Sequence, residues 1–128
     1  MSGFPKSERL VSRTLMEKLF NGGNSLSLAA YPLRAVFIKR ERAPEESPVQ
    51  LLISVPKKRF HHAVDRNRVK RQIREAYRQH KDTIHQVLSE KEQVLVAFVW
   101  LSDQQMATSE VERRIGKLLQ RMAEKLNG

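Results

Sequence analysis

Residues 50–100 read QLLISVPKKRFHHAVDRNRVKRQIREAYRQHKDTIHQVLSEKEQVLVAFVW, and this stretch decides the fold. It begins with a short apolar segment, residues 50–55, and ends with another, residues 93–100, in which nearly every side chain is apolar. Such segments are typical of β-strands, and the second has the composition of a strand buried on both faces. Residues 64–88 between them have the periodicity of a long helix, with a break expected near residues 81–82. This order predicts a sheet with a helix packed against it.

The N-terminal part of the chain adds a helix and a strand. Residues 7–20 predict a helix, with Ser7 as its expected N-cap and Asn-Gly-Gly-Asn at residues 21–24 as its stop. Residues 31–40 are rich in β-branched and aromatic side chains and predict a strand. Because only a polar loop separates this strand from the one at residues 50–55, we expect the two to form a hairpin.

The C-terminal part predicts one more helix, at residues 108–126, whose apolar side chains form a single stripe. The sequence also allows a short additional strand near residues 26–30, without requiring it. The predicted order is α-β-β-(β)-α-β-α, which indicates the α+β class with a central sheet and helices packed on it. With no internal repeat and no long linker, residues 1–128 are expected to form a single small domain with an ordered core at about residues 7–125.

The composition restricts the class of protein. The chain of 128 residues is 40% hydrophobic, which is enough apolar material for one core. It contains no cysteine, so disulfides and cysteine-based zinc sites are excluded, and we expect a cytoplasmic protein. Residues 1–10 lack the apolar centre of a signal peptide, and the longest apolar run, residues 94–101, is too short to span a bilayer. We therefore expect no membrane partner.

Positive charge is concentrated in one segment. The net charge of the chain is +10, and residues 57–81 contain ten Lys or Arg against two acids, so they carry +8 of it. At helical spacing, Val69 and Ile73 fall on an apolar stripe, while Lys70 and Arg74 fall on a basic flank beside it. Clustered cations of this kind predict binding to a polyanion. A membrane surface is the weaker alternative, because the apolar residues of this helix are needed in the core.

The residues of this segment resemble the signature of the bacterial ribonuclease P protein component. The family pattern is a strand ending in S-V-x-K-K, followed by A-V-x-R-N-R-x-K-R-x-x-R-E. The chain has Ser-Val-Pro-Lys-Lys at residues 54–58 and matches the second part at residues 63–75. Arg9, Leu10, Phe20 and Gly23 also stand where the family has these residue types.

The resemblance implies a fold in which a long helix joins two parallel strands by a left-handed crossover, against the usual right-handed rule. It implies a non-catalytic protein subunit that binds the RNA subunit of ribonuclease P and precursor tRNA, and no DNA. The enzyme removes the 5′ leader by phosphodiester hydrolysis. Catalysis is implied to belong to the RNA, with Mg²⁺ held mainly by the RNA and no cofactor intrinsic to the protein.

The resemblance also assigns residues to two sites and assigns none to catalysis. The RNA-contact residues are Lys57, Lys58, Arg66, Asn67, Arg68, Lys70, Arg71 and Arg74, to which the helical flank adds Arg78. The residues of the cleft for the single-stranded leader are Met16, Phe20, Arg34 and Ser54. Met16 and Arg34 stand at or near positions where an aromatic side chain is common in the family.

Other functions are weighed against this hypothesis. The principal alternative is a structural RNA-binding protein of the ribosomal or assembly type, which the charge would suit equally. A helix-turn-helix DNA-binding protein would need a short helix before residue 64, where the sequence has Pro56 and a strand. An autonomous nuclease would need clustered carboxylates, but Asp65 and Glu75 are too far apart to share a metal ion. Adjacent His61 and His62 are a weak basis for a metal site.

Overall fold

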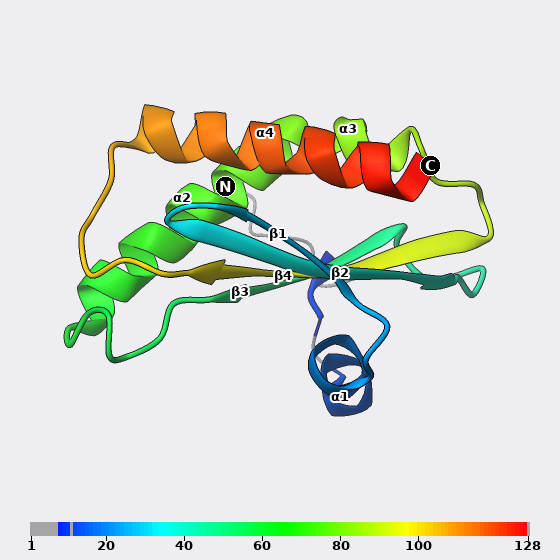
Figure 1. The fold of residues 1–128 in the computed structure, drawn as a ribbon, viewed down its shortest axis with the longest axis horizontal. Helices are drawn as coiled ribbons and strands as arrows, with labels where there is room; N and C mark the ends of the chain where they lie inside the picture. Colours follow the sequence, from blue (N-terminus) through cyan, green and yellow to red (C-terminus); the bar gives the residue numbers. More distant parts are fainter. Residues whose placement is uncertain (1–7, 11, 128) are drawn as a thin grey trace.

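The computed structural model describes residues 8–10 and 12–127 (Figure 1). Helices and strands follow each other in the order that the sequence predicts, and the optional strand at residues 26–30 is present. The elements are α1 (Arg13–Asn21), β1 (Leu26–Ala30), β2 (Leu33–Glu41), β3 (Val49–Ser54), α2 (Ala63–His80), α3 (Asp82–His85), β4 (Glu92–Trp100) and α4 (Thr108–Asn127). The predicted break of the long helix falls between α2 and α3.

The four strands form one mixed sheet in the order β1-β2-β4-β3. The hairpin predicted between β2 and β3 is therefore wrong: β2 pairs with β1 and with β4, both antiparallel, while the strand that β3 pairs with in the described sheet is β4, in parallel. The composition of β4 explains this order. Its side chains are buried along nearly the whole strand, and a strand with no polar face is stable only in the interior of a covered sheet.

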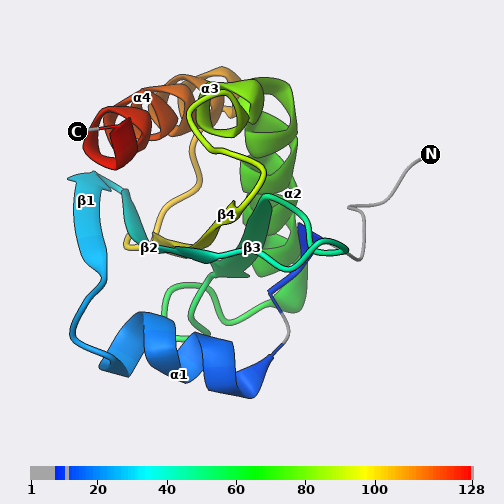
Figure 2. The same ribbon diagram turned by 90° about the vertical axis from the view of Figure 1, so that its right-hand side faces the viewer.

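The connection from β3 to β4 is left-handed. Both arrows point to the left in Figure 1, so both strands run away from the viewer in Figure 2. In Figure 2, β3 lies to the right of β4, and the chain passes from one to the other over the upper side of the sheet through α2 and α3. The path turns anticlockwise as it advances, which defines the left-handed crossover that the family resemblance implies.

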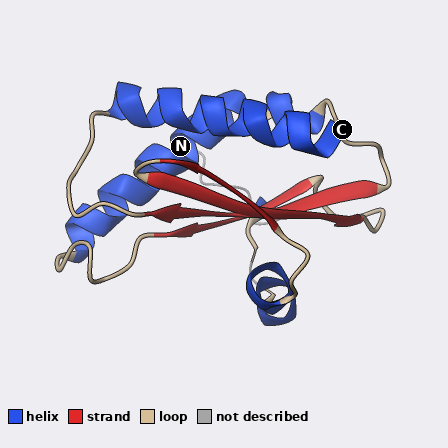
Figure 3. Cartoon of the chain, in the orientation of Figure 1, coloured by secondary structure: helices blue, strands red, loops and turns tan. Residues whose placement is uncertain are grey.

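Helices cover both faces of the sheet, and each interface has its own apolar cluster (Figure 3). The larger cluster lies between the sheet and the pair α2 and α4, and it includes Val69, Ile73 and Trp100, all fully buried. The predicted apolar stripe of α2 is thus confirmed. The smaller cluster joins Leu19 of α1 to Val36 and other side chains on the opposite face. None of the helices in the described ranges is long and apolar enough to cross a membrane.

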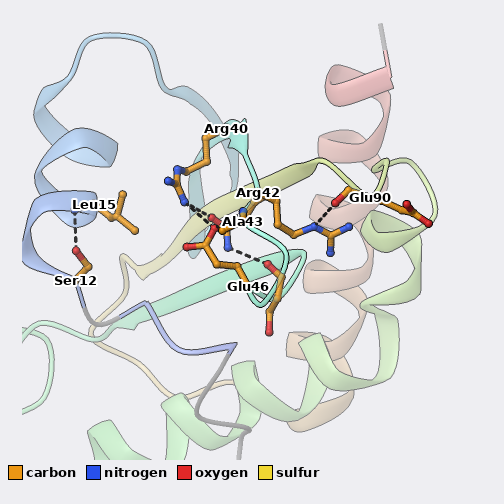
Figure 4. Close-up of polar contacts among 9 residues, drawn as sticks. Ser12, Leu15, Arg40, Arg42, Ala43, Glu46 and Glu90 are labelled. Atoms are coloured by element: carbon orange, nitrogen blue, oxygen red, sulfur yellow. Dashed lines mark hydrogen bonds and ion pairs between the residues drawn. The ribbon is translucent and has the colours of Figure 1, made fainter.

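The first helix begins later than the sequence predicts. It starts at Arg13, and the Ser12 side chain accepts a hydrogen bond of 3.3 Å from the Leu15 backbone N–H (Figure 4). The predicted cap, Ser7, lies outside the described residues. Arg9 and Leu10 are not helical: Arg9 forms a parallel bridge with Leu51 of β3, and the Leu10 N–H donates to the Leu51 carbonyl at 2.9 Å. Pairing with an open strand edge replaces the expected first helical turn.

The connection between β2 and β3 is fixed by polar contacts (Figure 4). Arg40 pairs with Glu46 at 3.4 Å, and the Glu46 carboxylate also accepts a hydrogen bond from the Ala43 N–H at 2.9 Å. Arg42 donates to the Glu90 carbonyl at 2.8 Å, which ties this loop to the segment before β4. The loop therefore crosses the end of β4 in a defined path, so that β3 reaches the far side of β4.

Candidate nucleic-acid interface

The segment before α2 and the basic flank of α2 present polar and cationic side chains that the fold does not use. Lys57, Lys58, Asn67 and Arg71 are exposed, and Lys70 is half-buried. Their side chains make no hydrogen bond or ion pair with any residue in the described ranges. Each of these Lys and Arg side chains adds to the self-repulsion of a strongly basic protein and has no anionic partner in the described ranges, so these groups are available to neutralise phosphates.

Arg66 has a structural contact in addition to its position in the predicted interface. Its Nη1 donates to the Phe60 carbonyl at 2.7 Å and to the His61 carbonyl at 3.1 Å. The N-cap residue, His62, makes no side-chain cap hydrogen bond. Arg66 therefore holds the preceding loop against the first turn of α2, a contact that helical periodicity does not reveal.

The loop after β4 also contacts the basic region. Arg59 pairs with Asp103 at 3.3 Å, and Arg68 Nη1 donates to Gln105 Oε1 at 2.6 Å. Behind them, the buried Gln72 donates to the Met106 carbonyl at 3.0 Å. Asp103 and Gln105 were not predicted from the sequence, because they lie in a polar loop without periodicity. Neither the charge distribution nor the residue spacing in the sequence indicates that these two residues contact Arg59 and Arg68.

The far end of the basic flank contains an internal ion pair. Arg78 forms hydrogen bonds to the Glu75 carboxylate, one turn earlier on α2, and these lower the pKa of Glu75. Glu75 is therefore a partner of Arg78 within the helix rather than a candidate metal ligand. Since the Arg78 charge is balanced within the helix, its contribution to binding a polyanion is expected to be smaller than that of Arg71.

Figure 2 shows α1, which carries Met16 and Phe20, on the opposite side of the sheet from α2. Arg34 and Ser54 face the same side, because each lies two residues from a side chain of the smaller apolar cluster, Val36 and Leu52. Arg34 and Ser54 are both paired in register with Val99 of β4, so they flank it on the same face of the sheet. Met16 packs against the smaller apolar cluster, whereas Phe20 has 46% of its surface exposed. The fold thus places Met16, Phe20, Arg34 and Ser54 on one face of the sheet. Arg34 and Ser54 lie in the same row across the strands, on either side of Val99.

Arg34 is oriented by a neighbouring strand. Its Nε donates to the Ser27 hydroxyl of β1 at 2.9 Å, and the side chain is otherwise exposed. The guanidinium plane can therefore stack on a base or contact a phosphate from a defined position.

The acidic and imidazole side chains do not converge. Within the described ranges, no three His, Asp or Glu side chains are grouped so that they could hold a metal ion. Asp65 and Glu75 stand on different turns of α2, ten residues apart in sequence. His61 and His62 are both exposed: His62 is the N-cap residue of α2, and His61 lies in the loop before it.

Comparison with known proteins gives one family. A family model described as Ribonuclease P matches residues 4–123. The ribonuclease P protein component of Porphyromonas gingivalis is 42% identical over 124 residues, which cover 94% of this chain and 87% of that protein. The corresponding protein of Chlorobaculum tepidum is 34% identical over 106 residues, covering 77% of this chain and 68% of its own length.

Solved structures show the same fold. A Staphylococcus aureus RNase P protein, described as a mutant with defective mRNA degradation activity, superposes with a TM-score of 0.68 at 22% identity, covering 93% of this chain and 90% of that one. The RNase P protein from Thermotoga maritima gives a TM-score of 0.66 at 23% identity, covering 89% and 96%. At these identities the likeness concerns the fold alone.

Proposed function

The chain belongs to the family of ribonuclease P protein components, and from that premise we propose that it is the protein subunit that binds the catalytic RNA and the 5′ leader of precursor tRNA. The subunit assists endonucleolytic removal of the leader, which leaves the mature 5′ end of the tRNA. The observation that carries the proposal is a group of exposed cations just before and on α2, Lys57, Lys58 and Arg71, which make no hydrogen bond or ion pair with the described residues. Such a group fits the phosphates of a folded RNA.

The proposed division of labour follows from the side chains at the site. Hydrolysis of the phosphodiester bond is assigned to the RNA subunit and to Mg²⁺ ions held mainly by that RNA. Guanidinium and ammonium groups repel a divalent cation, whose preferred ligands in proteins are carboxylate, carbonyl and water oxygens. The protein contributes binding: Arg68 and Arg71 on α2 toward the RNA subunit, and the α1 face toward the leader.

The leader is proposed to lie along the face that carries Phe20, Arg34 and Ser54. An exposed phenylalanine ring offers a surface on which an unpaired base can stack. Arg34 can contact a phosphate or stack in turn, and the Ser54 hydroxyl can donate or accept a hydrogen bond. These contacts need an unpaired strand, so they would distinguish precursor tRNA from the mature product, which has no leader.

The test is reconstitution of cleavage. Precursor tRNA is incubated with a bacterial ribonuclease P RNA at low Mg²⁺, with and without this protein. We expect cleavage only when both the RNA and the protein are present. Binding to the RNA without rescue of cleavage would instead favour a structural RNA-binding protein. Cleavage by the protein alone would overturn the assignment of catalysis to the RNA.

A matched pair of variants tests the basic flank. Arg71→Ala should weaken binding to the RNA subunit and reduce the slope of log affinity against log salt by about 0.7 to 0.9, the value for one phosphate contact. Lys125→Ala removes the same charge from the exposed last turn of α4, which Figure 1 places at the opposite end of the molecule from the start of α2. It should leave the slope unchanged. Equal effects of both variants would indicate attraction by net charge rather than a contact at α2.

A further inference from the structure

A hollow of about 290 Å³ lies at the outer edge of the sheet, between β3, α2 and the N-terminal segment. It is lined by Arg9, Leu10, Leu51, Leu52, Ile53, Lys70 and Arg74. Its volume is close to the lower end of the roughly 300–1,000 Å³ of typical small-molecule sites. The hollow is therefore of a size for one compact group rather than for an extended ligand.

The fold builds this hollow from three separate parts of the chain. β3 is an edge strand, and the N-terminal segment pairs with it only around Leu51, through the parallel bridge from Arg9 and the hydrogen bond from Leu10. The chain then leaves the edge to start α1 at Arg13. Figure 2 shows this segment beside β3, with α2 next to it. The strand edge beyond Leu51 is thus bordered by helix rather than covered by another strand.

Two cations of α2 border the hollow. Lys70 and Arg74 are four residues apart on one helix, so their side chains project from the same side. Both are half-buried, as is common for long cationic side chains whose aliphatic stems lie along apolar surface. The third cation, Arg9, comes from the N-terminal segment and is exposed.

The lining combines positive charge with an apolar floor. Among the described residues, the lining holds three cations and no carboxylate, and the Lys70 side chain has no hydrogen bond or ion pair with any of them. Leu10 and Leu51 are almost fully buried, whereas Leu52 and Ile53 keep part of their apolar surface accessible. Holding like charges such as those of Arg9 and Lys70 at one hollow is unfavourable unless an anion binds between them. Because the floor of the hollow is apolar, we expect the bound anion to have a flat or hydrophobic part that contacts it.

We propose that this hollow binds one unpaired nucleotide of the ribonuclease P RNA. Arg9, Lys70 and Arg74 hold its phosphate, and the sugar or base lies against Leu52 and Ile53. The inference rests on the proposed function, which supplies the RNA partner, and it adds a residue outside the basic helix, Arg9, to the interface. A nucleotide within a duplex would offer the phosphate but not a base free to contact the floor.

Affinity measurements test the charge part of the site. Arg9→Ala should lower affinity for the RNA subunit about three- to tenfold and reduce the salt slope by about 0.7, the value for a single-stranded contact. Lys70→Ala should do the same, and it remains informative if Arg9→Ala fails to fold. Lys125→Ala is the control of equal charge. Unchanged affinity and slope in both Arg9→Ala and Lys70→Ala would overturn the proposal.

Cross-linking tests the location. The chain has no cysteine, so Ile53→Cys provides a single attachment point for a photo-cross-linking group. In the holoenzyme with bound precursor tRNA, we expect a cross-link to one unpaired nucleotide of the RNA subunit. A cross-link to the leader of the precursor tRNA, to a base-paired nucleotide only, or to no RNA at all would overturn the proposal.

The wild-type protein is assayed for rescue of cleavage in the same preparation. If it rescues cleavage while the Arg9→Ala and Lys70→Ala variants bind normally, only the nucleotide site is wrong. If the wild-type protein fails to rescue cleavage, the proposed function is wrong, and the inference that rests on it fails as well.

Discussion

Arg68 Nη1 donates to Gln105 Oε1 at 2.6 Å, and Gln105 Nε2 donates to the Asp65 carbonyl at 3.3 Å. Gln105 lies in the loop after β4, yet it contacts both the first turn of α2 and the arginine one turn further on. A flexible exposed arginine loses side-chain entropy when it binds a phosphate. On the proposed function, in which Arg68 contacts the RNA subunit, the hydrogen bond from Arg68 to Gln105 would reduce that loss, and we infer a positioning role for Gln105.

The first prediction concerns this pair. Gln105→Ala should weaken binding to the RNA subunit about two- to tenfold, which is the cost of ordering one long side chain, about 0.5–1.5 kcal/mol. In an Arg68→Ala background the same change should have almost no effect, because the residue that Gln105 positions is gone. The measurement is a double-mutant cycle on RNA affinity.

Gln104→Ala is the matched control for this cycle, since Gln104 is exposed and no side-chain hydrogen bond is found for it within the described ranges. It should bind RNA like the wild type. Equal losses from Gln105→Ala with and without Arg68 would show that Gln105 acts independently of Arg68.

Arg66→Ala should affect stability as well as binding. The variant loses the hydrogen bonds to the Phe60 and His61 carbonyls, so we expect the free energy of unfolding to fall by about 1 kcal/mol. Arg71→Ala should leave that free energy within about 0.5 kcal/mol of wild type, because Arg71 is exposed. Urea denaturation measures both. Unchanged stability of Arg66→Ala would mean that its loop contacts contribute nothing net.

Two neighbouring residues of α1 should separate packing from leader binding. Leu19 is 1% exposed, so Leu19→Ala should destabilise the fold by about 2–5 kcal/mol. Phe20 is 46% exposed, so Phe20→Ala should cost much less stability while it weakens binding of precursor tRNA more than that of mature tRNA. The measurements are unfolding free energy and affinity for the two tRNAs. Equal weakening for both tRNAs would remove Phe20 from the leader site.

His85 should make stability depend on pH. Burial lowers its pKa most, the charge of Lys81 lowers it further and Arg42 slightly, while Glu8 and Asp82 act in the opposite direction. Its Nε2 is buried without a hydrogen-bond partner in the described ranges. The unfolded chain, with an ordinary histidine pKa near 6.5, then binds more protons than the folded one. Stability is fully present above about pH 6.5 and is lost as the pH falls below that value.

The check is the free energy of unfolding measured from about pH 7.5 to pH 5.5. His85→Gln should reduce the decline toward acid pH, whereas His61→Gln, at an exposed loop position, should retain it. A full decline in the His85→Gln variant would assign the pH dependence to other groups.

Strand pairing is where prediction from the sequence failed. Proximity along the chain favours a hairpin of β2 with β3, and a polar loop joins them. In the structure β4 is inserted between them, because its side chains, apolar from Val94 to Trp100, require a central place that neither β1 nor β3 needs. The apolar composition of this segment had already predicted, from the sequence, a strand buried on both faces. It indicated a covered strand, but it did not identify the neighbours, since side-chain alternation specifies faces and leaves pairing partners open.

By itself, the sequence determined what depends on local pattern. Periodicity in residues 64–88 gave the buried stripe with Val69 and Ile73, the basic flank beside it and the break after His80, because a helix places residues three and four apart on one side. The match to a long motif gave the family. These features need no knowledge of which segments meet in space.

Only the tertiary structure decided which side chains distant in sequence come together. It placed Arg34 and Ser54 on either side of Val99, Gln105 against Arg68, and Arg9 beside Lys70 at the edge of β3. Each of these contacts follows from how strands pair and how loops close, which is set by the packing of the whole core and not by any local pattern.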